Sequence, residues 1–201
     1  MRLTRITAIA VIVAGAIGLW LSGRTTPPSN IPASIGTFPG ASVVMVTLDT
    51  TRADRFGCYG STAGLTPFID SLAQRGVVFE NAQSVAPITL PSHASMLTGL
   101  YPTKHEVRNN GMFVLGDEIE TLAEVFSENG YATGAFVSAQ VLVARYGLDQ
   151  GFDIDDDDLS RSRTSGLSMV PSRRGNVTLE AAKEWLATQP SDKPVFLWLH
   201  L

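Results

Sequence analysis

The hydrophobic and polar positions of the chain fall into blocks that predict strands and helices in turn. Residues 42–48 (SVVMVTL) form an apolar, β-branched run, typical of a strand buried on both faces of a parallel sheet. Strand-like runs also cover residues 77–79, 132–137 and 195–201, and helical patterns cover residues 66–75, 117–129 and 176–189. This alternation predicts a doubly wound α/β fold, with a mostly parallel sheet and helices on both faces.

Capping signals define several helix ends. Thr66 is the expected N-cap of the first helix, with Pro67 at its first position and Gly76 past its end. Another helix is expected to contain Pro91 in its first turn and to run to about Thr98. Asn176 fits a glycosylation acceptor in Asn-Val-Thr, but its position favours an N-cap.

The amino-terminal forty residues indicate an export segment and a tether. Two arginines precede an apolar run over residues 6–21, which as a helix reaches about 24 Å against a hydrocarbon core of about 30 Å. Residues 1–22 are therefore interpreted as a signal peptide or a signal anchor, and residues 23–40, rich in Pro, Ser and Gly, as a linker. Either alternative places the domain outside the cytoplasm, and an anchor would contact the membrane through residues 6–21.

The domain is expected to begin near Ala41 and to be incomplete at its carboxyl end. Residues 195–201 have the pattern of a buried strand, which needs covering elements on both faces. We therefore expect residues 41–201 to be the amino-terminal part of a larger domain.

Composition excludes some partners. The net charge of −4 comes with no basic stripe, so nucleic acid is not an expected partner, whereas small anionic esters remain open. The single cysteine, Cys58, excludes an internal disulfide and is interpreted as a small apolar residue in a turn rather than a reactive thiol. The acidic run 153–158 is interpreted as a solvated loop rather than a calcium site.

Two positions carry candidate chemistry. Asp49 lies at the carboxyl end of the first predicted strand, where open α/β sheets bind ligands, so it is a candidate metal ligand or a turn residue. Thr89 lies at the start of the helix that contains Pro91, where free N–H groups stabilise an anion. Thr89 is either a nucleophile, activated by a metal that Asp49 binds, or a helix cap.

Three segments support the nucleophile. Residues 89–99 (TLPSHASMLTG) resemble the sulfatase signature, with Thr89 in the catalytic position. Residues 44–60 resemble the opening strand and first metal-binding turn of sulfatases, and residues 66–73 resemble their first helix. The resemblance covers residues 41–201 in segment order and is strongest over residues 43–111. It implies an alkaline phosphatase-like fold and a divalent metal bound by Asp49 and Thr89.

The chain also departs from sulfatases. The family carries Cys or Ser in the catalytic position and oxidises it to formylglycine, which Thr89 cannot form, so no formylglycine is expected. Further family contacts are replaced in this chain by Thr50, His93, Ser138 and Gln140.

Nucleotide pyrophosphatases and phosphodiesterases, which are related to sulfatases, use a Thr nucleophile, and this chain is similar to them. The shared positions are Thr89, Pro91, His93, residues 98–102, His105 and Asn110. The resemblance implies that His93, His105 and Asn110 bind substrate, with Asn110 donating to a non-bridging oxygen. The alternatives are two histidines with satisfied rings and a turn-forming asparagine before Gly111. His200 is interpreted as the polar end of a strand.

The first functional hypothesis is therefore a metal-dependent hydrolase of a sulfate or, by residue chemistry, a phosphate ester, with a covalent intermediate on Thr89. Oxygen ligands would favour calcium or magnesium, and histidine ligands zinc. The alternatives are a membrane-anchored transferase of a phosphoryl-containing headgroup, such as phosphoethanolamine, and an inactive truncated fragment.

Overall fold

The computed structural model describes residues 39–162 and 171–201. Within it, Gly40–Leu201 form one compact unit. The predicted export segment and nearly all of the linker lie outside the described residues. No helix in the described ranges is long and apolar enough to cross a bilayer.

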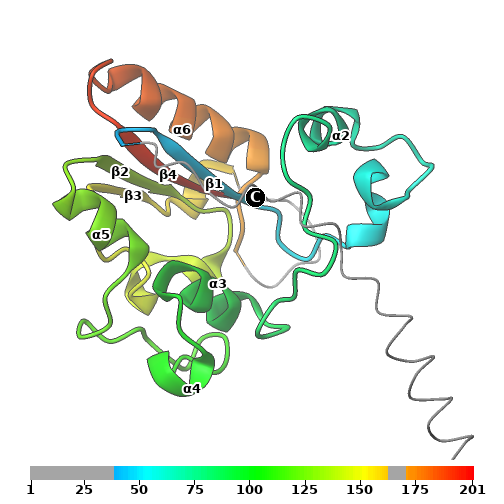
Figure 1. Cartoon of the computed structure of the whole chain (residues 1–201). Helices are drawn as coiled ribbons and strands as arrows, with labels where there is room; N and C mark the ends of the chain where they lie inside the picture. Colours follow the sequence, from blue (N-terminus) through cyan, green and yellow to red (C-terminus); the bar gives the residue numbers. More distant parts are fainter. Residues whose placement is uncertain (1–38, 163–170) are drawn as a thin grey trace, which may run out of the picture. The chain divides into compact units, whose positions relative to one another are not determined.

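The described strands form one parallel sheet in the order β1-β4-β2-β3 (Figure 1). Their bounds are Val43–Thr47 for β1, Val195–His200 for β4, Ala132–Phe136 for β2 and Ile154–Asp156 for β3. The register pairs Thr47 with His200 and Phe136 with Leu199, so the carboxyl ends of these strands meet at one edge. The predicted α/β fold with a parallel sheet is confirmed.

Side chains of the central strand β4 alternate between two cores. Trp198 packs with Leu90, Ala94 and Leu97 of helix α3 (Thr89–Thr98) on one face of the sheet. Leu197 and Leu199 pack with helix α6 (Gly175–Thr188) on the other. Burial of each such side chain contributes about 1.5–3 kcal/mol. Helices therefore cover both faces, as Figure 1 shows with α6 on one side and α3 on the other.

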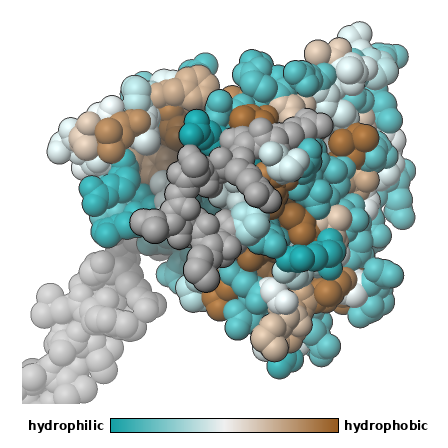
Figure 2. All heavy atoms as spheres, turned by 180° about the vertical axis from the view of Figure 1, so that it is seen from behind, coloured by the Kyte–Doolittle hydropathy of each residue, from teal (hydrophilic) through white to brown (hydrophobic). Residues whose placement is uncertain are grey.

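The strand at 42–48 is not buried on both faces as predicted. Within the described residues β1 pairs only with β4 and is an edge strand. The side chains of Val44 and Val46 are 56% and 50% exposed, so the face of β1 that they share is not covered within the described residues. Figure 2 shows hydrophobic residues in separate patches among hydrophilic ones on the face it draws.

The other α-helices in the described residues are α2 (Pro67–Ala73), α4 (Pro102–His105) and α5 (Leu122–Glu128). Helix α5 begins later than predicted, because the Thr121 hydroxyl accepts from the Glu124 N–H and the Glu124 carboxylate accepts from the Thr121 N–H. Short 3-10 helices occupy Ala53–Arg55, Gly57–Tyr59, Gln140–Leu142, Ala144–Tyr146 and Leu159–Ser162. Residues 77–79 are not a strand; Val77 and Phe79 are 70% and 64% exposed.

One predicted helix cap is confirmed in position and one is wrong. Thr66 is the N-cap residue of α2, with Pro67 at the first helical position, but its hydroxyl does not cap the helix; it accepts from the Gly57 N–H and donates to the Asp70 carboxylate. Asn176 lies inside α6, whose N-cap is Arg174. Cys58 is half-buried in a turn, where its N–H donates to Asp70.

The acidic run 153–158 is not a solvated loop. Its centre is strand β3, which pairs with β2. The guanidinium of Arg173, whose side chain is 0% exposed, lies 2.7 Å from a carboxylate oxygen of Asp156. Arg173 lies 17 residues after Asp156 in the sequence. The pattern of charges alone therefore could not predict the ion pair between them.

Asp155 makes folding stability depend on pH. Burial, and secondarily the charge of Asp157, raises the pKa of Asp155 to about 7. An unfolded aspartate titrates near about pH 4. Between these values the folded protein retains a proton that the unfolded chain has lost, so the contribution of Asp155 to stability falls as the pH rises from about 4 to about 7.

The variant Asp155→Asn is therefore expected to have a higher Tm than the unmodified protein at about pH 8 and a similar Tm at about pH 4. Thermal unfolding followed by circular dichroism at both pH values checks this, with Asp117→Asn at an exposed position as the control. An equal difference in Tm at the two pH values would contradict it.

Candidate functional site

A cavity of about 430 Å³ opens at the carboxyl end of β1. Its walls come from the turn after β1, from the segment before α3 and from the first turns of α3. The lining residues are Thr47, Leu48, Asp49, Thr50, Thr51, Ser84, Ala86, Pro87, Ile88, Thr89, Ser92, His93 and Met96. The cavity therefore lies at the carboxyl ends of the strands, where open α/β sheets bind their ligands.

Asp49 is fixed at the point where β1 ends. Its backbone N–H donates to the carbonyl of Leu201, which extends the pairing of β1 with β4 by one step. Thr50 then adopts a left-handed conformation with φ of 53°, and its N–H donates to Asp49 Oδ1 at 2.9 Å. The second carboxylate oxygen, Oδ2, remains directed toward α3.

The hydroxyl of Thr89 forms a hydrogen bond with Asp49 Oδ2. Thr89 is the first residue of α3, and its hydroxyl donates to Asp49 Oδ2 at 3.0 Å. The alternative role as a helix cap is wrong, because the N-cap residue of α3 is Ile88 and the Thr89 hydroxyl donates to Asp49 instead. The structure thus brings together the candidate nucleophile and the candidate metal ligand, forty residues apart.

Asn110 lies beside the amino terminus of α3. Its side-chain oxygen accepts the N–H of Leu90 at 2.9 Å, which fixes the amide next to Thr89. Asn110 therefore satisfies one of the N–H groups that a helix start leaves open. Its NH₂ group has two further donors, although Asn110 is not among the lining residues of the cavity.

His93 lines the cavity and is 3% exposed. Its Nδ1 lies 2.8 Å from the carbonyl oxygen of Thr89, and because a carbonyl only accepts, Nδ1 carries the proton. Burial lowers the pKa of His93, so the ring is neutral and Nε2 offers a lone pair. This Nε2 has no hydrogen-bond partner within the described residues.

The structure does not bring His105 to the cavity. Its Nδ1 accepts from the Val107 N–H, and its Nε2 therefore donates to the Ser95 hydroxyl at 2.9 Å. The residue is 2% exposed, and burial lowers its pKa. Both ring nitrogens thus form hydrogen bonds, one to Ser95 of α3 and one to the chain after α4. His105 is therefore a buried histidine with a satisfied ring, which was the alternative to substrate binding.

His200 lies beside Asp49, although its sequence pattern predicts only the polar end of a strand. Its Nε2 lies 3.8 Å from Asp49 Oδ2, and its ring centre lies 5.0 Å from that of His93. Burial, and then the neighbouring His93, lowers the pKa of His200 to about 4, so the ring is neutral at pH 7. The sequence indicated only that His200 ends a strand predicted to be buried. That this strand end lies next to the end of β1, where Asp49 follows, is known from the pairing of β4 with β1.

The residues present fit a divalent cation in part. The Asp49 carboxylate and the Thr89 hydroxyl are hard oxygen ligands on the same cavity, which His93 also lines, although the Nε2 of His93 is itself buried. Across residues 39–162 and 171–201, no group of three or more His, Cys, Asp or Glu side chains is arranged to hold a metal ion. Two oxygen groups, on Asp49 and Thr89, are fewer than the ligands of a complete cation site.

The sequence of this chain matches a known protein family. Residues 41–201 match the model of the family described as Sulfatase. The chain is 34% identical over 97 residues to the N-acetylgalactosamine-6-O-sulfatase of Bacteroides thetaiotaomicron, covering 46% of this chain and 19% of that protein. It is 32% identical over 133 residues to the ulvan-active sulfatase of Formosa agariphila, covering 66% of this chain and 25% of that protein.

A solved structure carries the same fold. The structure of BT4656 in complex with its substrate D-glucosamine-2-N,6-O-disulfate superposes with a TM-score of 0.66 at 20% identity, covering 80% of this chain and 34% of that chain. The chain spans about a fifth of the length of the curated relatives it matches.

Proposed function

Because the chain belongs to the sulfatase family, we propose that the protein hydrolyses an anionic ester through a covalent intermediate on Thr89. The observation that carries the proposal is the hydrogen bond from the Thr89 hydroxyl to Asp49 Oδ2 at the amino terminus of α3. A hydroxyl there has an acceptor for its proton and lies where backbone N–H groups favour an anion.

The residues suggest the following step. Thr89 Oγ1 attacks the sulfur or phosphorus of the ester, its proton passes toward Asp49, and the bond to the leaving alcohol oxygen breaks as that oxygen takes up a proton from solvent. Water then attacks the sulfur or phosphorus of the intermediate, and the bond to Thr89 Oγ1 breaks as Oγ1 takes back the proton held by Asp49. The sulfate or phosphate product leaves, and the excess proton of the attacking water passes to solvent. The NH₂ group of Asn110, fixed through Leu90, would donate to a non-bridging oxygen as charge builds up on it.

Asp49 and Thr89 would also hold a divalent cation, either calcium, magnesium or zinc. When bound, such an ion would neutralise charge on the ester oxygens and favour the deprotonated hydroxyl. His93 would hold the backbone of Thr89 in place through its Nδ1–H.

Two substrate classes have separate support. The relatives compared above are named sulfatases, which favours a sulfate ester. Thr89 favours a phosphate ester, because formylglycine requires a Cys or Ser in its position. Nothing in the site favours a lipid or glycan acceptor over water. We further propose that the domain acts outside the cytoplasm, on the basis of the charged and apolar pattern of residues 1–22.

The whole protein product that contains this chain is to be assayed with para-nitrophenyl sulfate, para-nitrophenyl phosphate and bis-para-nitrophenyl phosphate. We expect the protein to turn over at least one of these esters. Removal of divalent cations by a chelator should abolish the turnover, and addition of calcium, magnesium or zinc should restore it. Absence of turnover with all three esters and all three cations would contradict the proposal.

A further inference from the structure

His200 occupies a position that its sequence pattern did not suggest. It ends the central strand β4, pairs in register with Thr47 and is 2% exposed. Its ring centre lies 5.0 Å from that of His93, and its Nε2 lies 3.8 Å from Asp49 Oδ2. A polar ring in this position is costly to bury unless its nitrogens have partners.

The protonation of the ring is set by a backbone N–H. The N–H of Ser138 donates to His200 Nδ1 at 3.4 Å, so Nδ1 is the nitrogen without a proton. In a neutral imidazole the proton then lies on Nε2. A nitrogen that carries a proton cannot ligate a metal ion, so His200 is a donor in this site.

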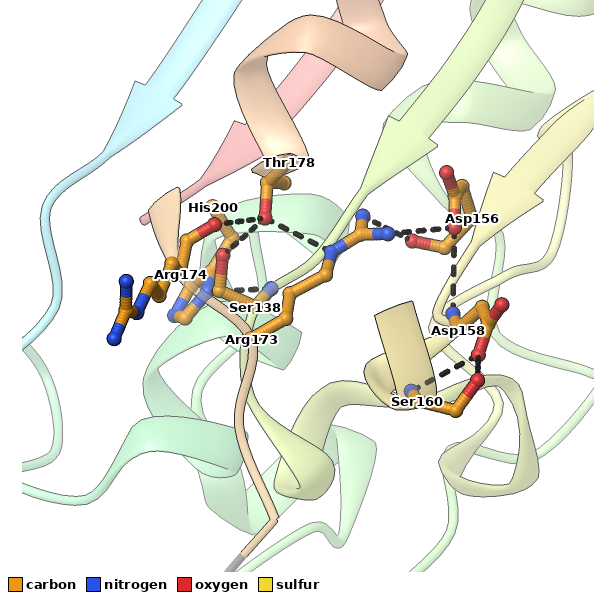
Figure 3. Close-up of polar contacts among 8 residues, drawn as sticks. All are labelled: Ser138, Asp156, Asp158, Ser160, Arg173, Arg174, Thr178 and His200. Atoms are coloured by element: carbon orange, nitrogen blue, oxygen red, sulfur yellow. Dashed lines mark hydrogen bonds and ion pairs between the residues drawn. The ribbon is translucent and has the colours of Figure 1, made fainter. Parts of the chain in front are cut away.

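Ser138 is itself held firmly (Figure 3). Its carbonyl accepts the backbone N–H of Arg173 at 3.0 Å, and its hydroxyl lies 2.6 Å from that of Thr178. Arg173 Nε donates to the same Thr178 hydroxyl at 2.9 Å, and its guanidinium pairs with Asp156. This buried network fixes the N–H that faces His200.

His93 has the opposite tautomer. Its proton lies on Nδ1, which donates to the Thr89 carbonyl, so its Nε2 has a lone pair. The two rings therefore present one proton and one lone pair, and neither Nε2 has a hydrogen-bond partner within the described residues. The carboxylate oxygen near His200 Nε2 is Asp49 Oδ2, at 3.8 Å, which is the acceptor of the Thr89 hydroxyl.

We propose that His200 is a positioning residue, whose Nε2–H attracts Asp49 Oδ2 and holds that carboxylate in place to accept the Thr89 hydroxyl. The His200 side chain is 2% exposed and that of Asp49 26%, so the attraction across this gap is screened less than between two groups in open solvent. The inference rests on the proposed roles of Thr89 and Asp49. The first test of this inference does not depend on enzyme activity. A failure of the inference can therefore be told apart from a failure of the proposed function.

The first test is a long-range proton–nitrogen NMR correlation of the histidine rings. The chain has three histidines. His93 is expected as the Nδ1–H tautomer, and His200 and His105 as Nε2–H tautomers. In Asp49→Asn the Nε2 resonance of His200 should shift, whereas that of His105 should not. A His200 that is charged or protonated on Nδ1, or is unaffected by Asp49→Asn, would overturn the proposal.

The second test compares His200→Phe with His200→Gln. Phenylalanine keeps a ring but has no donor, whereas the glutamine amide places an N–H close to the position of Nε2. His200→Phe is expected to lower kcat by about 10- to 100-fold with KM nearly unchanged, and His200→Gln to recover most of that loss. Equal kcat values in the two folded variants would refute a positioning role. If either variant fails to fold, the NMR test alone decides.

Discussion

Replacing Thr89 with alanine is expected to lower kcat by about four to six orders of magnitude, the range seen when a hydrolase loses its nucleophile. The methyl group of alanine leaves the helix start and the cavity intact, but it removes the oxygen that bonds Asp49 Oδ2. No covalent intermediate can then form, and any residual rate comes from binding and charge stabilisation alone. Steady-state kinetics with the best ester from the substrate assay measures the loss.

Ser92→Ala is the matched control for this variant. Ser92 lines the same cavity one turn further along α3, but its hydroxyl contacts Ser84, at 2.8 Å, and not Asp49. We expect its kcat to stay within a few-fold of the unmodified protein. Similar losses in both variants would contradict the assignment of Thr89 as nucleophile.

Replacing Asp49 with asparagine is expected to lower kcat/KM by about 100- to 10,000-fold, as for the loss of a group that takes up a proton in the transition state. Asparagine has nearly the same shape, and its oxygen can still accept from the Thr50 N–H, as the Asp49 carboxylate does. It has no negative charge, so both the acceptor strength for the Thr89 proton and the attraction for a cation fall. Kinetics and calorimetric titration with the activating cation measure the two effects.

Asp54→Asn serves as the control for Asp49→Asn. Asp54 lies five residues further along the chain, forms an exposed ion pair with Arg52 and does not line the cavity. Unchanged kinetics are expected, because exposed ion pairs contribute little. An Asp49→Asn variant with full activity and full cation affinity would remove Asp49 from the site.

Much of the fold follows from local patterns. The apolar runs at β1, β2 and β4 and the turn at Pro91 were sufficient to place strands and helices to within a few residues. The meeting of Asp49 and Thr89 also follows from sequence, because the carboxyl ends of parallel strands and the following helix starts share one edge of the sheet.

Other features depend on tertiary pairing that no local pattern contains. His200 joins Asp49 only because β4 lies next to β1, and strand order cannot be derived from alternation. His105 was assigned to substrate from spacing, but spacing does not give side-chain direction, and its ring turns toward Ser95. The acidic run was predicted to be solvated because the partner of Asp156, Arg173, lies beyond the following loop.

Mass spectrometry of the protein, quenched by acid during turnover, detects a covalent intermediate on Thr89 directly. The peptide containing Thr89 is expected to gain the mass of one sulfuryl or phosphoryl group, located on Thr89 by fragmentation, and Thr89→Ala is expected to show no such gain. Turnover with Thr89 unmodified at every quench time, or with the group on Ser92 instead, would contradict it.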